Sequence, residues 1–336
     1  MDWLRAHAVK LTALALVIAV FAAPVLAFIW MTSAPGKSWQ GLLPALTATE
    51  IDLAKRLRSH VEAIASEPHN TGHPEAFERS ARYIERTLAS YGYQVTTQPF
   101  DEGHARNIEV TLVPDDGPGP TLVIGAHYDS ALNATGANDN GSGAAALLEL
   151  ARLLIDLQAR TSFPIRMVFF ANEEPPFFKT DRMGSLVYAE RLKDSGERVG
   201  AMWSLETMGY FSDRPDSQRY PFPLSLRYPD TGDFIAFVGT TSSRALVRKT
   251  VMAFREVAQF PSVGGSAPGL VQGIDWSDHW AFEQMGVPAL MITDTAPFRY
   301  PHYHRVEDTP DKLDYPRLAR VVAGLERVIR SWRTDP

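Results

Sequence analysis

The sequence contains no cysteine, and this absence removes two classes of site. Disulfide bonds and thiolate metal sites are both excluded. Any metal ion must therefore be held by histidine and carboxylate side chains, which suit zinc and the harder divalent cations. Lack of cysteine does not by itself identify the cellular compartment.

The chain also lacks a long basic block, internal repeats and low-complexity tracts. It has 39 acidic and 33 basic residues and a formal net charge of −6. That balance excludes the electrostatic footprint of a nucleic-acid-binding protein, so no nucleic-acid partner is expected. With 336 residues and 45% hydrophobic content, the chain can form one large α/β domain or two small ones.

One long apolar run is present near the N-terminus. Residues 11–31 are uncharged and apolar apart from one threonine, which is about the ~20 residues that a membrane-spanning helix needs. Arg5 and Lys10 precede this run, and Lys37 is the first charge after it. The excess of positive charge before the run predicts a cytoplasmic N-terminus and an exported body.

We interpret residues 11–31 as an uncleaved transmembrane signal anchor, preceded by a cytoplasmic segment at 1–10. A Pro/Gly linker at 32–46 would connect the anchor to a catalytic domain at 47–336. The protein would then be single-pass in a bacterial inner membrane, with its domain in the periplasm. The alternative is a cleaved signal peptide and a secreted protein.

The body alternates between strand and helix patterns. Alternation of this kind predicts a single doubly wound α/β domain with a mostly parallel central sheet flanked by helices. Residues 211–230 follow neither period, and are either an irregular insertion near the site or a plain surface loop. A Gly/Ser/Pro loop is expected at 263–273. Strands are expected at 93–100, 107–113, 122–126, 165–171, 200–204, 234–239 and 288–293, and helices at 47–66, 77–91, 143–157, 184–192, 245–257 and 318–329.

Chemistry-bearing residues gather where the buried strand at 122–126 ends. His127 and Asp129 follow that strand, and a glycine-rich loop then brings Asp139 to the start of a helix. Ligands of open α/β sheets collect outside the carboxyl ends of the strands. A histidine and two carboxylates at this position predict a metal site.

Two further strands end in carboxylates. Glu173 and Glu174 follow the buried strand at 165–171, and Glu206 follows the strand at 200–204. Alone, each would be a solvated loop residue; beside His127 and Asp139, the functional interpretation is stronger. A carboxylate close to a metal but not bound to it can act as a general base for water.

This set of strand-end residues, with one late histidine, is too rich for a single zinc ion, which needs about four ligands. It fits two metal ions that share a carboxylate. Asp139, on its glycine loop, can lie between strands and bridge the ions. Asp129 could hydrogen-bond the second nitrogen of His127 and orient it.

Six ordered motifs resemble a known family. They are His-Tyr-Asp-Ser from His127, Gly-Ala-Asn-Asp-Asn-Gly-Ser-Gly from Gly136, Asn-Glu-Glu from Asn172, Leu-Glu-Thr-Met-Gly from Leu205, Ser-Asp-His from Ser277 and His-Arg-Val-Glu-Asp-Thr from His304. In this order they resemble the co-catalytic zinc aminopeptidases of metallopeptidase family twenty-eight, over residues 47–332. The resemblance implies the zinc exopeptidase fold and peptide substrates with a free N-terminus.

The resemblance also implies two zinc ions per chain and a role for each site residue. His127, Asp139 and Glu206 would hold one ion, while Asp139, Glu174 and His304 would hold the other. Glu173 would be the general base, and Asp129 would orient a ligand. His304 is preferred to His302 because the family's last histidine stands four residues before an Asp-Thr pair. The carbonyl-stabilising tyrosine is left open among Tyr210, Tyr300 and Tyr303.

Two alternatives stay open. A glutaminyl-peptide cyclotransferase resembles this family and uses one zinc ion, but its members usually carry tryptophan where Tyr303 stands and Asp-Asp-His where Ser277-Asp278-His279 stands. A non-catalytic, membrane-attached binding domain would be expected to have lost ligands. The chain departs from the commonest family pattern at Glu206, where many members have aspartate, and at Pro175–Phe178, which suggests altered substrate access.

Overall fold

The computed structural model describes residues 7, 10, 20–114 and 119–332. Within this part of the chain, one eight-stranded sheet runs in the order β1-β2-β4-β3-β5-β8-β6-β7. The strands are β1 (Thr96–Phe100), β2 (Ala105–Leu112), β3 (Thr121–His127), β4 (Ile165–Phe170), β5 (Val199–Glu206), β6 (Ile235–Thr240), β7 (Ser262–Ala267) and β8 (Ala289–Thr293).

The four central strands β4, β3, β5 and β8 are parallel to one another. Strands β2 and β6 join this core antiparallel, and β7 pairs parallel with β6. The predicted α/β fold with a mostly parallel centre is therefore confirmed, with antiparallel pairing confined to its flanks. Because the central strands share one direction, their carboxyl ends meet at the same edge.

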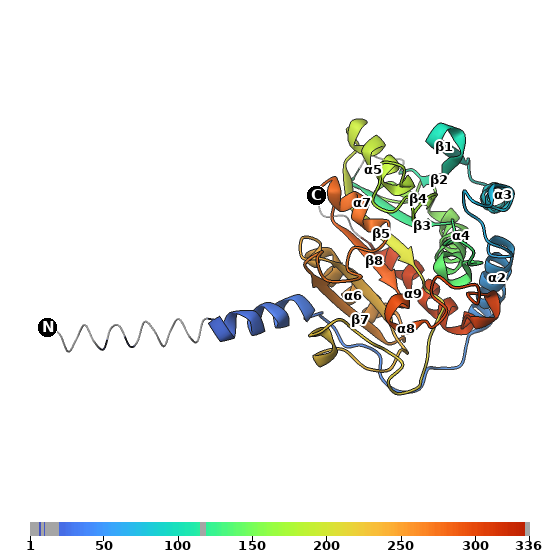
Figure 1. Ribbon diagram of the computed structural model, residues 1–336. Helices are drawn as coiled ribbons and strands as arrows, with labels where there is room; N and C mark the ends of the chain where they lie inside the picture. Colours follow the sequence, from blue (N-terminus) through green and yellow to red (C-terminus); the bar gives the residue numbers. More distant parts are fainter. Residues whose placement is uncertain (1–6, 8–9, 11–19, 115–118, 333–336) are drawn as a thin grey trace.

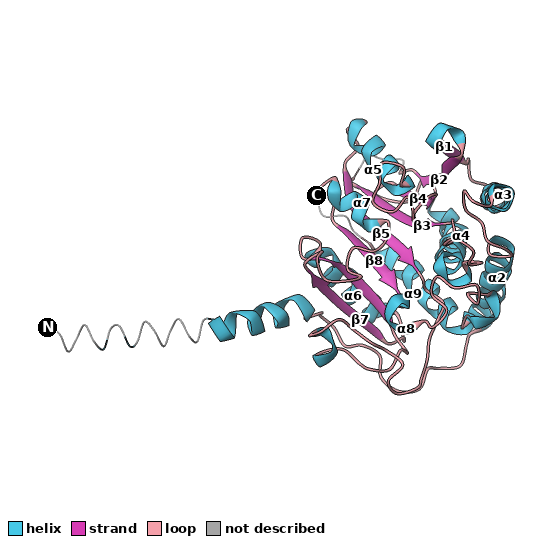
Figure 2. Ribbon diagram, viewed as in Figure 1, coloured by secondary structure: helices cyan, strands magenta, loops and turns pink. Residues whose placement is uncertain are grey.

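Helices cover both faces of the sheet (Figures 1 and 2). One face carries α2, α3, α4, α6 and α9, and the other carries α5 and α7. The helices of the body are α2 (Ala48–Ile64), α3 (Pro74–Ser90), α4 (Gly143–Leu154), α5 (Gly184–Asp194), α6 (Arg244–Val257), α7 (His279–Gln284), α8 (Ala296–Arg299) and α9 (Tyr315–Ser331).

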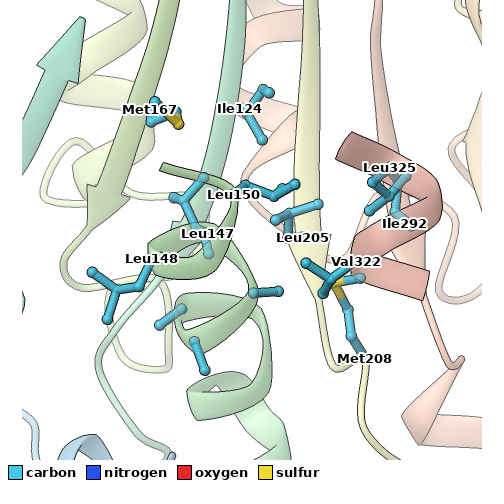
Figure 3. Packing of buried hydrophobic residues seen from close by; sticks show 14 of the residues in the cluster. Ile124, Leu147, Leu148, Leu150, Met167, Leu205, Met208, Ile292, Val322 and Leu325 are labelled. Atoms are coloured by element: carbon cyan, nitrogen blue, oxygen red, sulfur yellow. The ribbon is translucent and has the colours of Figure 1, made fainter. Parts of the chain in front are cut away.

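Helix α4 is the centre of the larger core. Its Leu147 and Leu150 point toward Ile124 of β3, Met167 of β4 and Leu205 of β5 (Figure 3), and all of these side chains are fully buried. Truncating one such side chain to alanine typically costs about 2–5 kcal/mol. This packing fixes the start of α4, and hence the glycine-rich loop before it, against the strand ends.

The strand β7 corrects the expectation of a loop at 263–273. Its glycines argued against a strand, but they make room for neighbours: a Cβ on Gly265 would collide with the hydroxyl of Tyr228, and one on Gly264 would press on Val251. Close approach of other residues is a common reason for glycine inside a strand.

Residues 20–32 form a helix that projects away from the body (Figure 1). Among the residues that the structure describes, no helix is both long and apolar enough to cross a membrane. The expected anchor at 11–31 extends over residues 11–19, which lie outside the described residues. The segment expected as a linker contacts the body, since the Ser262 amide donates to Ser38 Oγ at 2.8 Å.

Candidate metal centre

Three neighbouring parallel strands deliver the central side chains. His127 is the last residue of β3, Glu206 is the last residue of β5, and Glu173 and Glu174 follow β4. Since β4, β3 and β5 are adjacent in the sheet, these ends converge. All four residues are buried.

Asp139 reaches the same point from the loop between β3 and α4. The loop turns at Gly136, which has φ 69°, and a Cβ there would lie 2.7 Å from the carbonyl oxygen of Asp139. Glycine is therefore required at this position, because it has no Cβ and tolerates positive φ. The turn brings the buried Asp139 carboxylate back beside His127.

The five expected ligands form two triads that share Asp139. In the inner triad, His127 Nε2 lies 3.4 Å from Asp139 Oδ1 and 3.3 Å from Glu206 Oε2. In the outer triad, His304 Nε2 lies 3.0 Å from Asp139 Oδ2 and 3.2 Å from Glu174 Oε2. The two oxygens of Asp139 thus face different histidines.

These separations suit metal coordination. Zinc bound tetrahedrally at about 2.0–2.2 Å separates neighbouring ligand atoms by roughly 3.3–3.6 Å. Within each triad the potential ligand atoms lie within 4.8 Å of one another. Three buried atoms in the two triads also lack hydrogen-bond partners: His127 Nε2, Asp139 Oδ2 and Glu174 Oε1. Unpartnered buried polar atoms are rare and need an explanation, which a cation bound by the triads would provide.

The electrostatics support the same conclusion. Burial, together with the negative charge of Asp139, raises the pKa of Glu174 to about 8 and that of Glu206 to about 7. Burial also raises the pKa of Glu173 well above its ordinary value, and Glu174 and Glu206 add to this effect. A divalent cation would lower these pKa values and stabilise the crowded carboxylates.

Glu173 lies beside both triads. Its Oε2 is 3.8 Å from His127 Nε2, farther than either inner carboxylate. A carboxylate near a metal ion but outside its ligands is the arrangement expected of a general base.

Asp129 holds several parts of the site at once. Its carboxylate accepts hydrogen bonds from the backbone amides of Glu173 and Glu174, both at 3.1 Å. Its Oδ1 also lies 3.5 Å from His127 Nδ1, and its carbonyl oxygen is 3.1 Å from the same nitrogen. This geometry suits the predicted role in orienting His127 and adds a role in positioning the two glutamates.

Asp308 is a positioning residue that sequence reasoning missed. Its Oδ1 accepts from the Asn138 amide and the Tyr300 hydroxyl, both at 2.8 Å, and its Oδ2 accepts from the Asp139 amide at 3.1 Å. Asp129 and Asp308 therefore each clamp two successive amides of a ligand-bearing segment. The sequence signal for Asp308 was its place in the Asp-Thr pair that led us to prefer His304 to His302.

Ser277 holds the carboxylate of Glu206, the residue that stands where many family members have aspartate. Its hydroxyl donates to Glu206 Oε2 at 2.8 Å and lies 2.7 Å from Ser204 Oγ. The next residue, Asp278, stands at the N-terminus of α7, is buried, and makes no capping hydrogen bond. His69, in the loop before α3, is buried and its amide donates to Ser130 Oγ at 2.9 Å.

Of the three candidate tyrosines, Tyr303 faces the carboxylates. Its ring stacks on His304 with centroids 3.9 Å apart. Burial raises the pKa of Tyr303 well above its usual value, with further contributions from Asp139 and Glu174. Tyr300 instead donates its hydroxyl proton to Asp308, and Tyr210 packs against Tyr300.

A pocket with a cavity volume of about 90 Å³ lies beside Glu206 of the inner triad. Glu206, Thr207 and Tyr303 line the end nearest the triads, and the remaining walls are mostly apolar. Part of the irregular segment at 211–230 forms one wall, so this segment lies near the site. Apolar residues of the walls are Pro221, Leu224, Val238, Ile274, Met291 and Phe298.

Residues 107–329 match the profile of peptidase family M28. The chain belongs to this family. The Escherichia coli (strain K12) uncharacterized protein YfbL is 40% identical over 300 residues, which span 85% of this chain and 90% of that protein. An Arthroderma otae protein named probable leucine aminopeptidase is 26% identical, over 72% of this chain and 62% of its own length. The chain therefore spans less than two thirds of this fungal member.

The fold recurs among solved structures. A Bacteroides thetaiotaomicron glutaminyl cyclase bound to N-acetylhistamine superposes with a TM-score of 0.62 at 18% identity, over 83% of this chain and 98% of that one. At this identity the likeness is one of fold. The chain thus belongs to a family of peptidases, and its fold is shared with a glutaminyl cyclase.

Proposed function

We propose that this M28 protein is a zinc aminopeptidase that removes N-terminal residues from peptides. The observation that carries the proposal is the shared carboxylate: Asp139 directs one oxygen to each of two triads, and each triad contains a histidine and a second carboxylate. Paired ligand sets of this kind suit two metal ions and peptide hydrolysis.

Zinc held by the triads would polarise the scissile carbonyl and lower the pKa of a water molecule. The residues of the chain have separate tasks around it. Glu173 accepts the proton of the attacking water and returns it to the leaving amine, since its carboxylate lies beside the inner triad without being one of the expected ligands. Tyr303 donates a hydrogen bond to the oxygen of the polarised carbonyl, and Asp129 holds His127 and the two glutamates in place.

The pocket beside Glu206 provides the side-chain specificity. Its walls are apolar and open. We expect an uncharged, apolar N-terminal residue in the substrate, because a charged side chain would lose its hydration there without gaining a partner.

The variant Glu173→Gln tests the mechanism. We expect it to retain zinc while kcat falls about 10²- to 10⁴-fold, the usual contribution of a general base. Glu190→Gln, an exposed position on α5, is the matched control. Hydrolysis of aminoacyl anilides by Glu173→Gln at a near wild-type rate would exclude the proposed role.

A glutaminyl-peptide substrate in the same assay separates hydrolysis from cyclisation. Two complete triads support the aminopeptidase, since the cyclotransferase reaction uses one zinc ion. Zinc analysis of the purified protein tests the remaining alternative, because a non-catalytic binding domain would return no zinc.

We also propose that residues 11–31 attach the protein to a bacterial inner membrane, with the peptidase domain in the periplasm. The uncharged run and the basic residues before it support this proposal. N-terminal sequencing distinguishes it from secretion, since signal cleavage would remove Met1 and the apolar run.

A further inference from the structure

Three large apolar side chains stand exposed on two loops beside the pocket. Phe222, Leu226 and Leu270 are 82%, 74% and 90% exposed, and we call them the apolar rim. The same two loops line the pocket that leads to the inner triad, through Pro221, Leu224, Gln272 and Gly273. Exposed apolar side chains on loops that border a pocket are a feature of interaction surfaces.

The two stretches that carry the apolar rim contain few charged residues. Residues 217–229 contain only Arg219 and Arg227 as charged residues, and residues 262–274 contain none, although the whole chain carries a net charge of −6. Asp216 and Asp230 flank the first stretch, and Asp275 directly follows the second. An uncharged or cationic apolar surface suits phospholipid headgroups, which attract arginine and lysine when anionic.

Three arginines of α6 hydrogen-bond the end of the N-terminal helix and the residues that follow it. Arg244 Nε donates to the Trp30 carbonyl at 2.9 Å, and its guanidinium lies 4.1 Å from the Trp30 ring centroid. Arg248 donates to the Ser33 carbonyl at 2.6 Å, and Arg255 donates to the Pro35 carbonyl at 2.8 Å. Carbonyls at a helix C-terminus lack intrahelical partners, and cations there are favourable. This arginine clamp therefore fixes the direction of the helix.

The end of the helix lies close to both rim loops. Thr32 and Ala34 line the same hollow as Tyr228, which follows the rim residue Leu226 by two positions. On the other side, Ser266 Oγ donates to the Met31 carbonyl at 3.4 Å. Figure 1 draws the helix leaving the body beside the short olive helix at Leu224–Leu226.

The N-terminal helix at 20–32 exposes apolar side chains and has no polar face. Its large side chains, Val20, Phe21, Val25, Leu26, Ile29 and Trp30, are exposed. A helix that is apolar all round is stable only when buried. The arginine clamp fixes the helix relative to the body. A bilayer that the helix enters would therefore also come close to the apolar rim.

We propose that the apolar rim rests in the interface of the phospholipid bilayer that the N-terminal helix enters. The pocket then opens toward the bilayer surface. The inference depends on the membrane attachment proposed above, but not on the peptidase chemistry.

The cysteine-free chain allows a direct test. Phe222→Cys and Leu270→Cys, each labelled with an environment-sensitive fluorophore, are reconstituted as full-length protein in vesicles of phosphatidylethanolamine and phosphatidylglycerol. A fraction of the lipid carries a nitroxide quencher at a shallow acyl position. Ser90→Cys is the control, since Ser90 is exposed on α3, on the side of the body away from the helix (Figure 1).

We expect several-fold stronger quenching at positions 222 and 270 than at position 90, with emission shifted to shorter wavelength. Equal quenching at all three positions would overturn the proposal. Disulfide-linked dimers of the unlabelled Leu270→Cys variant would assign the rim to a second copy of the chain, and would overturn it as well. Failure of the full chain to float with vesicles would refute both the attachment and the rim contact, while zinc content and peptide hydrolysis would test the peptidase separately.

Discussion

The inner and outer triads contain the same kinds of side chain but are built differently. In the inner triad, two ligands are the last residues of adjacent strands, and the His127 side chain is 1% exposed. In the outer triad, His304 stands on the loop after α8 with φ 57°, and its side chain is 35% exposed. One site is fixed by the sheet, and the other depends on a loop.

This difference has a chemical consequence. A ligand fixed by the sheet loses little freedom when it binds a metal ion, whereas a loop histidine loses more. The inner ion should therefore bind more tightly and leave last. The shared carboxylate couples the two ions, so damage to Asp139 should affect both.

The largest effect is expected for Asp139→Asn. The amide has the shape of the carboxylate but only one accepting oxygen and no charge, so it cannot serve both histidines. We expect zinc to be lost from both triads and activity to fall by more than the roughly 10- to 100-fold typical of orienting residues. Inductively coupled plasma mass spectrometry gives the zinc content, and circular dichroism verifies the fold. Retention of both ions would refute the bridging role.

The next comparison separates the triads. His304→Ala should leave about one zinc ion per chain, held by the inner residues, because zinc binds with three protein ligands in many sites. His127→Ala should weaken binding of the inner ion, and the remaining ion should exchange rapidly with a chelator. Competition with a fluorescent chelator measures both affinities. If His304→Ala loses zinc as completely as His127→Ala, the two triads are equivalent and the proposed asymmetry is wrong.

A smaller effect is expected for Asp308→Asn. Asp308 accepts from the Asn138 and Asp139 amides, and it ends the loop that carries His304. Weakening this clamp should lower the affinity for the outer ion about 10- to 100-fold, as replacement of groups that orient ligands typically does. Excess zinc should restore most of the activity, which a purely catalytic role would not allow. Asp311→Asn, on the exposed segment that follows, is the control.

These residues also show what the sequence could predict. Parallel strands converge at their carboxyl ends, so His127, Glu173, Glu174 and Glu206 were identified as neighbours from short apolar runs and the residues after them. The glycine-rich loop after the strand at 122–126 added Asp139, and the motif order added His304. The structure brings all of these side chains together and confirms the expected fold.

Other features depended on contacts that no local pattern encodes. The clamp by Asp308 joins residues 170 positions apart in the chain. The strand β7 has a glycine-rich sequence because Tyr228 and Val251 approach its backbone. His69 lies in a loop between helices, yet this loop packs against Ser130 and buries the histidine. In each case the deciding partner lies far away in sequence.

The smallest expected effect is a pH dependence of the metal-free protein. Burial raises the folded-state pKa of Glu206 to about 7 and that of Glu174 to about 8, well above unfolded values near 4.3. The folded state therefore binds these protons more tightly, and the free energy of unfolding should fall as the pH rises from about 4 to about 8. Thermal unfolding of chelator-treated protein at several pH values measures the trend, and zinc should weaken it. Glu206→Gln should make the decrease between about pH 4 and 7 smaller, whereas Glu174→Gln should make it smaller over a range that continues to about pH 8. The same decrease in both variants and in the zinc-loaded protein would mean that neither triad is its source.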